Sequence, residues 1–398
     1  MFFDEVSEAP SDPVFGKIGV FNADPRKDKV NLMVGIYVDE FLKKRMFPSV
    51  IAAKDRASKN DQIADYLPFH GNSEFVGLIG TLLFGEELWK ANQTKIYGAQ
   101  ALGGTGAVCL GAKFLVQEVS KMAAILQPTW PNHRNILERA GCSVVDLPYY
   151  STQLHRFDSK NYFQALRALA PKTAVLFHAS CHNPTGSDPT REEWRQIAHI
   201  MKEKNLVPFF DCAYQGIGDG MAEDAEAIRF FLKEEMEMVI AYSCSKNFSL
   251  YCQRVGAIFV VTKDEKSKHH VGSQMQRIIR GVYSNPPAHG AQIVVEVMRD
   301  PVLIRQWENE VNQARERLCN NREIFLRELI ERSKTVDFRF AKHHKGMFSY
   351  LDLNEKQVER LKEKHAVYTL GGGRINLAGL NQENISKVVE AIVEVCNH

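Results

Sequence analysis

Short apolar runs alternate with amphipathic stretches through most of the 398-residue chain. Runs of β-branched and aromatic residues between turn residues are typical of buried strands, and helical spacing between such runs is typical of parallel βαβ units. Strands are predicted at residues 123–126, 143–147, 174–177, 206–210, 238–242 and 256–261. The pattern therefore predicts an α/β fold, with a mostly parallel sheet flanked by helices on both faces. Because the last run follows the fifth after a short loop, we expect one antiparallel strand.

The helical patterns divide the chain into two parts. Thr190 and Glu193 have the spacing of a capping box, and apolar residues then repeat at helical spacing to Met201. From about residue 301, long charged helical patterns at residues 306–334 and 384–397 enclose short apolar runs at residues 347–351 and 374–377. This change predicts a second, smaller domain that contains both helices and strands.

Composition excludes several classes of protein. The formal net charge of +2 gives no basic field for nucleic acid or an anionic membrane, so we expect neither as a partner. The chain has no long uninterrupted apolar segment, and its acidic opening is unlike a secretory or mitochondrial leader, which predicts a cytoplasmic protein. The eight cysteines lack the spacing of metal ligands and are interpreted as reduced thiols, mostly in the core.

Lys246 lies where the apolar run at residues 238–242 opens into a polar loop. An amine desolvated at the end of a strand loses affinity for its proton and becomes a nucleophile toward carbonyl carbon, as a Schiff-base lysine requires. Ser243, Ser245 and Arg254 lie near it in the sequence and can hold a phosphate. An ordinary loop lysine is the alternative for the Ser-x-Ser-Lys sequence alone.

Other polar groups follow the predicted strands. Asp211 closes the run at residues 206–210, at the edge where ligands of open α/β sheets bind, and Tyr214 follows three residues later. Asn183 offers an amide before a Pro-Thr-Gly turn, and Trp130 could cover an aromatic ring. Residues 103–106 (Gly-Gly-Thr-Gly) precede a helical pattern at residues 107–119, where backbone amides suit a phosphate.

Each of these features has an ordinary structural explanation when taken singly. Asp211 could cap a turn, Trp130 could pack in the core, and the glycine-rich loop matches neither the Walker nor the dinucleotide pattern. Together they fit one ligand that has a phosphate, an aromatic cation, a ring oxygen and an aldehyde. That ligand is pyridoxal 5'-phosphate.

Eight motifs occur in the same order as in one known family. They are residues 30–35, 103–107, 182–186 (His-Asn-Pro-Thr-Gly), 209–216, 243–247 (Ser-Cys-Ser-Lys-Asn), 254–256, 284–287 (Ser-Asn-Pro-Pro) and 373–376. Through them the chain resembles the aspartate aminotransferases among the fold type I pyridoxal-phosphate enzymes. The resemblance implies a large cofactor-binding domain with a seven-stranded sheet (residues 46–313). It also implies a small, closing domain from both chain ends (residues 15–45 and 314–398) and an N-terminal arm (residues 1–14).

The resemblance also implies a role for each candidate residue. Lys246 would bond covalently to pyridoxal 5'-phosphate and act as general base and acid. Asp211, supported by His133, would keep the pyridine nitrogen protonated, and Tyr214 and Asn183 would bond the ring oxygen. The residues implied in catalysis are Lys246, Asp211, Tyr214 and Trp130, the last stacked on the ring. The phosphate would be held by Gly103, Gly104, Thr105, Ser243, Ser245 and Arg254, and by Tyr66 of a second subunit.

Substrate choice would depend on two arginines. Arg374 would pair with the α-carboxylate, assisted by Gly35, Asn183 and Trp130. Arg280 would reach from the neighbouring subunit of a homodimer with shared active sites to the side-chain carboxylate of a dicarboxylic amino acid. The implied reaction is the reversible transfer of the amino group from L-aspartate to 2-oxoglutarate, which gives oxaloacetate and L-glutamate.

Alternative functions stay open at this point. Residues 36–38 (Ile-Tyr-Val) are apolar where the family usually carries a small residue, a tyrosine and a basic residue, and Phe47 is nearby. Apolar surface there would stabilise aromatic side chains by about 25 cal/mol per Å² buried, so a broad-specificity aromatic aminotransferase is one alternative. A β-lyase or decarboxylase would share Lys246 and Asp211 without needing both arginines. A nicotinamide dehydrogenase is disfavoured by the missing glycine fingerprint, and a non-enzymatic binding protein by the complete set of catalytic side chains.

Overall fold

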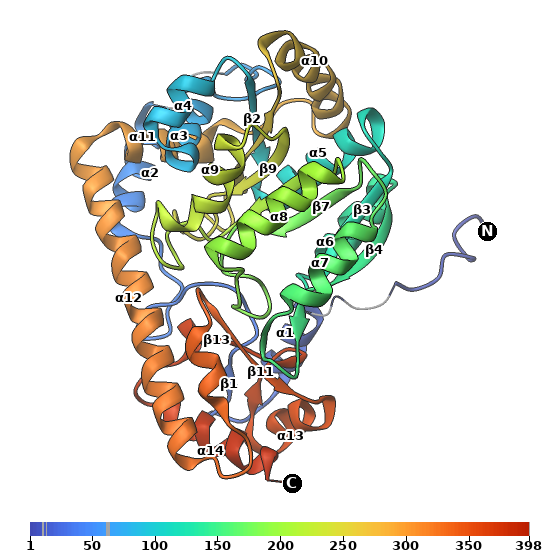
Figure 1. Cartoon of the computed structure of the whole chain (residues 1–398). Helices are drawn as coiled ribbons and strands as arrows, with labels where there is room; N and C mark the ends of the chain where they lie inside the picture. Colours follow the sequence, from blue (N-terminus) through green and yellow to red (C-terminus); the bar gives the residue numbers. More distant parts are fainter. Residues whose placement is uncertain (10–11, 13, 61–63, 398) are drawn as a thin grey trace.

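A seven-stranded sheet forms the centre of the computed structural model, which describes residues 1–9, 12, 14–60 and 64–397 (Figure 1). The strand order is β2-β10-β9-β8-β7-β3-β4. The strands are β2 (Ile96–Leu102), β3 (Met122–Gln127), β4 (Ser143–Pro148), β7 (Ala174–His178), β8 (Val207–Cys212), β9 (Met238–Ser243) and β10 (Val255–Val261). β10 pairs antiparallel with β2 and β9, and every pair from β9 to β4 is parallel. The predicted α/β fold, with one antiparallel member, is confirmed.

Strand β2 is the member of the sheet for which no run was predicted. Gly98 and Gln100 interrupt its apolar pattern. A Cβ at Gly98 would lie 2.6 Å from Val76 Cγ1, so glycine is needed for a helix to approach the strand. Gln100 is buried and donates from Nε2 to the Pro287 carbonyl at 2.7 Å. Both residues are explained by distant parts of the chain.

Helices cover both faces of the sheet because alternate strand residues enter two separate cores. Phe209 lies in a core with α5 (Gly103–Glu118), α6 (Asn132–Ala140) and α10 (Glu265–Val282). Phe210 lies in the other core, with α3 (Ser73–Phe84), α7 (Ser159–Ala168), α8 (Arg191–Glu203) and α9 (Glu226–Lys233). The remaining α-helices are α1 (Phe15–Ala23), α2 (Pro48–Asn60), α4 (Glu86–Asn92), α11 (Ala288–Arg299), α12 (Pro301–Arg332), α13 (Glu355–His365) and α14 (Ile385–Cys396).

Two helix starts compare directly with the sequence pattern. The capping box of α8 is confirmed: Thr190 Oγ1 accepts from the Glu193 amide at 3.2 Å, and Glu193 Oε2 accepts from the Thr190 amide at 2.8 Å. Helix α5 begins at Gly103, four residues before the predicted start at Ala107. The glycine-rich motif is therefore the first turn of the helix itself, and apolar periodicity missed it because glycines carry no apolar side chain.

The C-terminal part of the chain forms a smaller region below the sheet (Figure 1). Helix α12 runs from the region of the central sheet into the smaller region. In the smaller region β11 (Phe348–Leu353) pairs antiparallel with β13 (Gly372–Asn376), and β1 (Val30–Asn31) pairs parallel with β12 (Val367–Tyr368). Since β1 and β12 come from opposite ends of the chain, we propose a small domain of residues 15–45 and 314–398 and a large domain of residues 46–313. The expected N-terminal arm, residues 1–14, includes residues 10, 11 and 13, which lie outside the described residues. A short hairpin, β5 (Tyr150–Ser151) with β6 (Arg156–Phe157), follows β4, and its Tyr150 ring contacts the Tyr350 ring of the smaller region.

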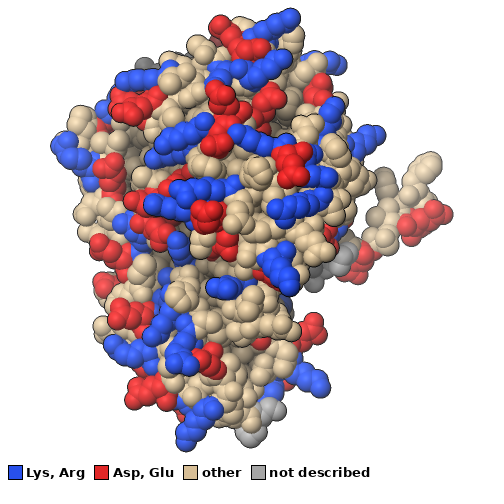
Figure 2. Space-filling view, viewed as in Figure 1, with Lys and Arg blue, Asp and Glu red and all other residues tan. Residues whose placement is uncertain are grey.

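The charges on the surface agree with the composition, whereas the positions of the thiols agree with it only in part. Basic and acidic side chains are interspersed over the face in Figure 2. All eight cysteines are free, but only four of them, Cys142, Cys181, Cys212 and Cys244, are buried, so the prediction that most of them lie in the core is wrong. Among the described residues, no helix is both long and apolar enough to cross a membrane.

Candidate active site

The carboxyl ends of three parallel strands bring the predicted polar residues together. The register pairs His178 of β7 with Asp211 of β8, and Asp211 with Ala241 of β9. The loops that follow these strands carry Asn183, Tyr214 and Lys246. A pocket of about 610 Å³ opens at this edge.

Most of the predicted site residues line this pocket. They are Gly35, Gly104, Thr105, Trp130, Asn183, Asp211, Tyr214, Ser243, Ser245, Lys246, Arg254 and Arg374. Gly103 and His133 lie directly behind the lining, because a Cβ at Gly103 would be 2.7 Å from Arg254 Nη2 and His133 bonds Asp211. Tyr66 and Arg280 do not line the pocket.

The Lys246 amine has the environment of a nucleophile. Its Nζ lies 4.9 Å from the centre of the Tyr214 ring. Burial lowers the pKa of Lys246 to about 8; Asp211 opposes this shift and Arg254 adds to it. An appreciable fraction of the amine is therefore unprotonated near neutral pH, as attack on a carbonyl carbon requires.

Asp211 is a buried carboxylate that is held by a histidine. His133 Nε2 lies 3.0 Å from Asp211 Oδ2, and His133 Nδ1 lies 2.9 Å from Thr129 Oγ1. Burial favours a higher pKa for Asp211, but the hydrogen bond to His133 and nearby positive charge bring the pKa below its ordinary value. Asp211 Oδ1 is buried without a partner among the described residues. A cationic ligand atom in the pocket would satisfy this oxygen.

Backbone amides and hydroxyl groups form a cradle for an anion. The first turn of α5 contains Gly104 and Thr105, and the side chain of the N-cap residue, Leu102, makes no capping hydrogen bond. A Cβ at Gly104 would lie 2.9 Å from Ser243 Cβ, so glycine permits the close approach of the helix to β9. Ser243 Oγ accepts from the Ser245 amide at 3.2 Å, and Arg254 Nη1 donates to Ser245 Oγ at 3.4 Å. Amides of a helix N-terminus, hydroxyls and a guanidinium together suit a phosphate.

Arg374 connects the smaller region to the pocket. Its guanidinium is buried and donates from Nη1 to Asn183 Oδ1 at 2.8 Å, and from Nη2 to the Met33 carbonyl. Its Nε has no partner among the described residues. Burial lowers the pKa of Arg374 to about 10, so the group is still cationic at neutral pH. This arrangement suits a carboxylate ligand.

Tyr66 and Arg280 belong to two adjoining segments of the chain, outside the pocket lining. Tyr66 is 85% exposed, and Arg280 is exposed at the C-terminal end of α10. The Arg280 guanidinium lies 5.9 Å from the Phe69 ring centre and donates to Ser284 Oγ. Asn285 Nδ2 donates to the Leu67 carbonyl at 2.6 Å, which joins the two segments. Within one chain these side chains are therefore separate from the pocket.

Sequence reasoning missed several residues at this site. His178 and Tyr251 line the pocket but were not predicted there. Burial lowers the pKa of His178 to about 3, so the ring is neutral. The centre of this ring lies 4.9 Å from the centre of the His133 ring. His182 lies 4.7 Å from His178 and bonds Thr185 Oγ1 at 2.8 Å. The position of His178 at the end of a predicted strand, next to the strand that carries Asp211, was the available signal.

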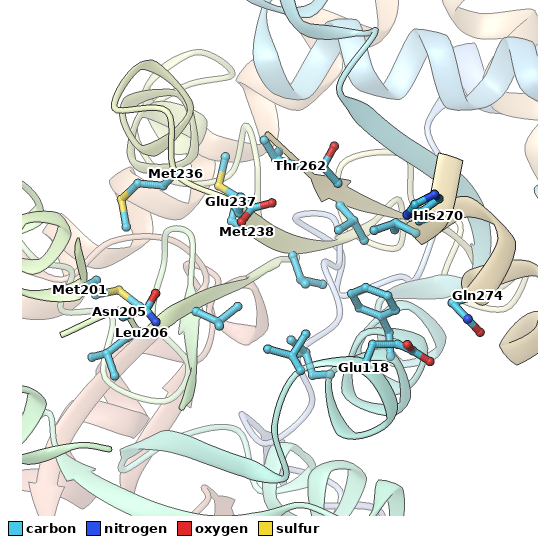
Figure 3. Close-up of a pocket in the computed structure, with 18 of the residues that line it drawn as sticks. Glu118, Met201, Asn205, Leu206, Met236, Glu237, Met238, Thr262, His270 and Gln274 are labelled. Atoms are coloured by element: carbon cyan, nitrogen blue, oxygen red, sulfur yellow. The ribbon is translucent and has the colours of Figure 1, made fainter. Parts of the chain in front are cut away.

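A larger pocket lies at the other end of these strands, beside the amino ends of β8 and β9 (Figure 3). It has a volume of about 830 Å³ and a floor that includes the buried side chains of Leu206, Met236 and Met238. Exposed Glu118 and Glu237 lie at its rim. None of the predicted site residues lines it. The smaller pocket at the carboxyl edge, where the chemically active groups meet, is therefore the candidate active site.

Known proteins are similar to this chain along its whole length. A family model described as aminotransferase class I and II matches residues 27–392. The aspartate aminotransferase of Escherichia coli (strain K12) is 39% identical over 394 residues, which cover 99% of this chain and 100% of the relative. The aromatic-amino-acid aminotransferase of Pseudomonas aeruginosa is 35% identical over 395 residues, with 99% of both chains covered. The crystal structure of the aromatic-amino-acid aminotransferase from Burkholderia pseudomallei, covalently bound to pyridoxal phosphate, has a TM-score of 0.95 at 38% identity and covers 99% of both chains. The chain therefore belongs to the class I and II aminotransferases, as its motifs predicted.

Proposed function

We propose that this protein uses pyridoxal 5'-phosphate, bonded to Lys246, to transfer the amino group reversibly from L-aspartate to 2-oxoglutarate. The observation that carries the proposal is one pocket that contains a lysine of lowered pKa, an anion cradle and the buried Arg374. The name of the Escherichia coli relative supports aspartate as the substrate. We also propose a cytoplasmic location.

The residues of the pocket fit each chemical group of this cofactor. The cradle of α5, Ser243, Ser245 and Arg254 would hold the phosphate. The unpartnered Asp211 Oδ1 would accept a hydrogen bond from a protonated pyridine nitrogen. Asn183 and Tyr214 offer donors for the ring oxygen, and Trp130 offers an aromatic face. The fit thus rests on an orphaned buried oxygen and on a cradle that a Cβ at Gly104 would narrow.

The side chains would divide the work of the reaction. When bound, pyridoxal phosphate supplies an aldehyde that bonds to amino groups and a ring that withdraws electrons from the neighbouring carbon. Lys246 Nζ would take the proton from the substrate α-carbon and deliver it to the carbon of the cofactor's aldehyde, as its lowered pKa allows. Arg374 and Asn183 would orient the α-carboxylate so that this proton faces the lysine. The ionised Asp211, held by His133, would maintain a positive charge on the ring nitrogen.

The proposal requires a homodimer with shared active sites. Tyr66 and Arg280 lie outside the pocket of their own chain, on one surface with Phe69. In a dimer this surface would complete the pocket of the second copy, with Tyr66 at the phosphate and Arg280 at the side-chain carboxylate of the substrate.

Aromatic substrates are the second candidate. Val34, Ile36 and Phe348 line the pocket and present apolar surface. The Pseudomonas aeruginosa and Burkholderia pseudomallei relatives are named as aromatic-amino-acid aminotransferases, which supports this broader specificity. Steady-state rates with aspartate, phenylalanine and tyrosine, each with 2-oxoglutarate as acceptor, separate the candidates. Turnover of aspartate alone would exclude the broad specificity, and no turnover of any of the three would refute both.

A further inference from the structure

Residues 33–38, which we call the entrance strap, include part of the lining of the pocket. Val34, Gly35 and Ile36 of the strap line the pocket. The smaller region holds the strap through its carbonyl groups. Arg374 donates to Met33, Asn376 Nδ2 donates to Val34 at 2.6 Å and to Ile36 at 2.9 Å, and Arg317 Nη1 donates to Val38 at 2.8 Å. The strap therefore belongs mechanically to the C-terminal region.

One hydrogen bond connects the strap to the opposite wall of the pocket. The Tyr37 amide donates to the Tyr251 hydroxyl at 2.8 Å. Of the hydrogen bonds between residues that the structure describes, it is the one that joins the strap to residues 46–313. Tyr251 lies in the loop between β9 and β10, and its carbonyl accepts from Arg254 Nη1 at 2.9 Å. That loop also carries Lys246, so a single hydroxyl links the strap to the chemically active loop.

The buried Tyr251 hydroxyl is suited to accept a hydrogen bond at a fixed position. Burial raises the pKa of Tyr251, so the phenol is neutral at physiological pH. Its oxygen accepts from the Tyr37 amide, and the ring lines the pocket. On the other side of the strap, a Cβ at Gly35 would lie 2.9 Å from Phe348 Cζ, so the strap cannot move far toward Phe348. Loss of the phenol oxygen would leave the partly buried Tyr37 amide without its acceptor.

We propose that Tyr251 is a positioning residue that holds the entrance strap against the pocket and thereby sets the affinity for substrate. The inference rests on the proposed transaminase function. Tyr251 acts through the strap and takes no part in proton transfer. Its removal is therefore expected to weaken substrate binding much more than it slows turnover.

The test is Tyr251→Phe in the full-length protein reconstituted with pyridoxal 5'-phosphate. We expect KM for L-aspartate to rise about tenfold and kcat to change less than about threefold, because an unpaired Tyr37 amide leaves the strap less firmly held beside Tyr251. Hydrogen exchange at the Tyr37 amide, measured without substrate, should accelerate. The cofactor absorption band should match that of the wild type. Tyr150→Phe is the matched control: its hydroxyl is buried and has no hydrogen-bond partner among the residues that the structure describes, and its ring contacts Tyr350 of the smaller region.

The outcomes separate this proposal from the function on which it rests. Unchanged KM together with unchanged exchange at Tyr37 would overturn the positioning role. A fall in kcat at constant KM, with an altered cofactor band, would also overturn it, since Tyr251 would then act on the Lys246 loop. If the wild type has no transaminase activity, the proposed function fails, while the exchange measurement still tests the link between Tyr251 and the strap.

Discussion

Arg374 and Asn183 are joined by a hydrogen bond of 2.8 Å, although they lie 191 residues apart. Arg374 belongs to β13 of the smaller region, and Asn183 follows β7 of the central sheet. The pair places a buried cation at the boundary of the two parts. A substrate carboxylate bound there would contact both regions, so binding and closure would be coupled.

Replacement of Arg374 tests the carboxylate site. Arg374→Lys keeps the charge but loses the planar pair of donors, so kcat/KM for aspartate should fall about 10- to 100-fold, mostly through KM. Steady-state kinetics measure this change. Arg332→Lys, at an exposed arginine paired with Glu328, is the control and should have no effect. An Arg374→Lys enzyme with unchanged KM would show that the carboxylate binds elsewhere.

Burial of the Lys246 amine predicts a pH-dependent instability of the cofactor-free protein. The folded-state pKa is lowered to about 8, against about 10.4 for an ordinary lysine, so the unfolded chain binds more protons between these values. Stability should therefore rise with pH through this window. Below pH 8 the destabilisation of the folded state by the buried amine reaches its full value, up to about 3 kcal/mol.

Lys246→Met removes this cost. The cofactor-free variant should be more stable than the cofactor-free wild type at pH 7, and the difference should shrink by pH 10.5. Urea unfolding at the two pH values provides the measurement. A variant that is less stable than the wild type at pH 7 would contradict the lowered pKa.

Shared active sites predict complementation between two inactive variants. Lys246→Ala removes the nucleophile of its own site, and Arg280→Ala removes the arginine expected in the site of the partner. A mixed dimer would keep one complete site, so an equal mixture that exchanges subunits should recover about a quarter of wild-type activity toward aspartate. Assays before and after subunit exchange provide the comparison. No recovery, with exchange confirmed by mass spectrometry, would argue that each chain builds its own site.

The apolar side chains of the entrance strap predict that a substitution there selectively lowers activity toward aromatic substrates. Ile36→Ala removes apolar surface from the pocket, and at about 0.8 kcal/mol per CH₂ group the loss in kcat/KM for phenylalanine should be about 5- to 30-fold. Aspartate turnover should change less than about threefold. Ile51→Ala, at an exposed position of α2, controls for general effects. Equal losses for both substrates would indicate that Ile36 does not select the side chain.

The sequence predicted best where chemistry and local pattern coincide. Asp211 lies near the end of the strongly apolar β8, and Lys246 follows the strongly apolar β9, so their position at the carboxyl ends of the strands could be expected from the apolar pattern. The early start of α5 at Gly103 was missed because glycines lack an apolar pattern. Strand β2 was missed because Gly98 and Gln100 are required there by contacts with residues that are distant in the sequence.

Long-range hydrogen bonds could not be predicted from local pattern. The Tyr37 amide and the Tyr251 hydroxyl are 214 residues apart, and nothing in their neighbourhoods indicates the pairing. His178 was overlooked because a histidine at a strand end is an ordinary core residue unless the next strand carries Asp211. The fold brings such pairs together only when the whole sheet is assembled.

The absorption spectrum of the reconstituted protein, recorded before and after addition of L-aspartate without any oxo acid, tests the central claim most directly. The account predicts a near-visible band of the lysine-bound cofactor that is lost on addition of aspartate and restored by 2-oxoglutarate. Lys246→Ala should lack both the initial band and its restoration. A wild-type band that does not respond to aspartate, or a full response in Lys246→Ala, would contradict the proposed function.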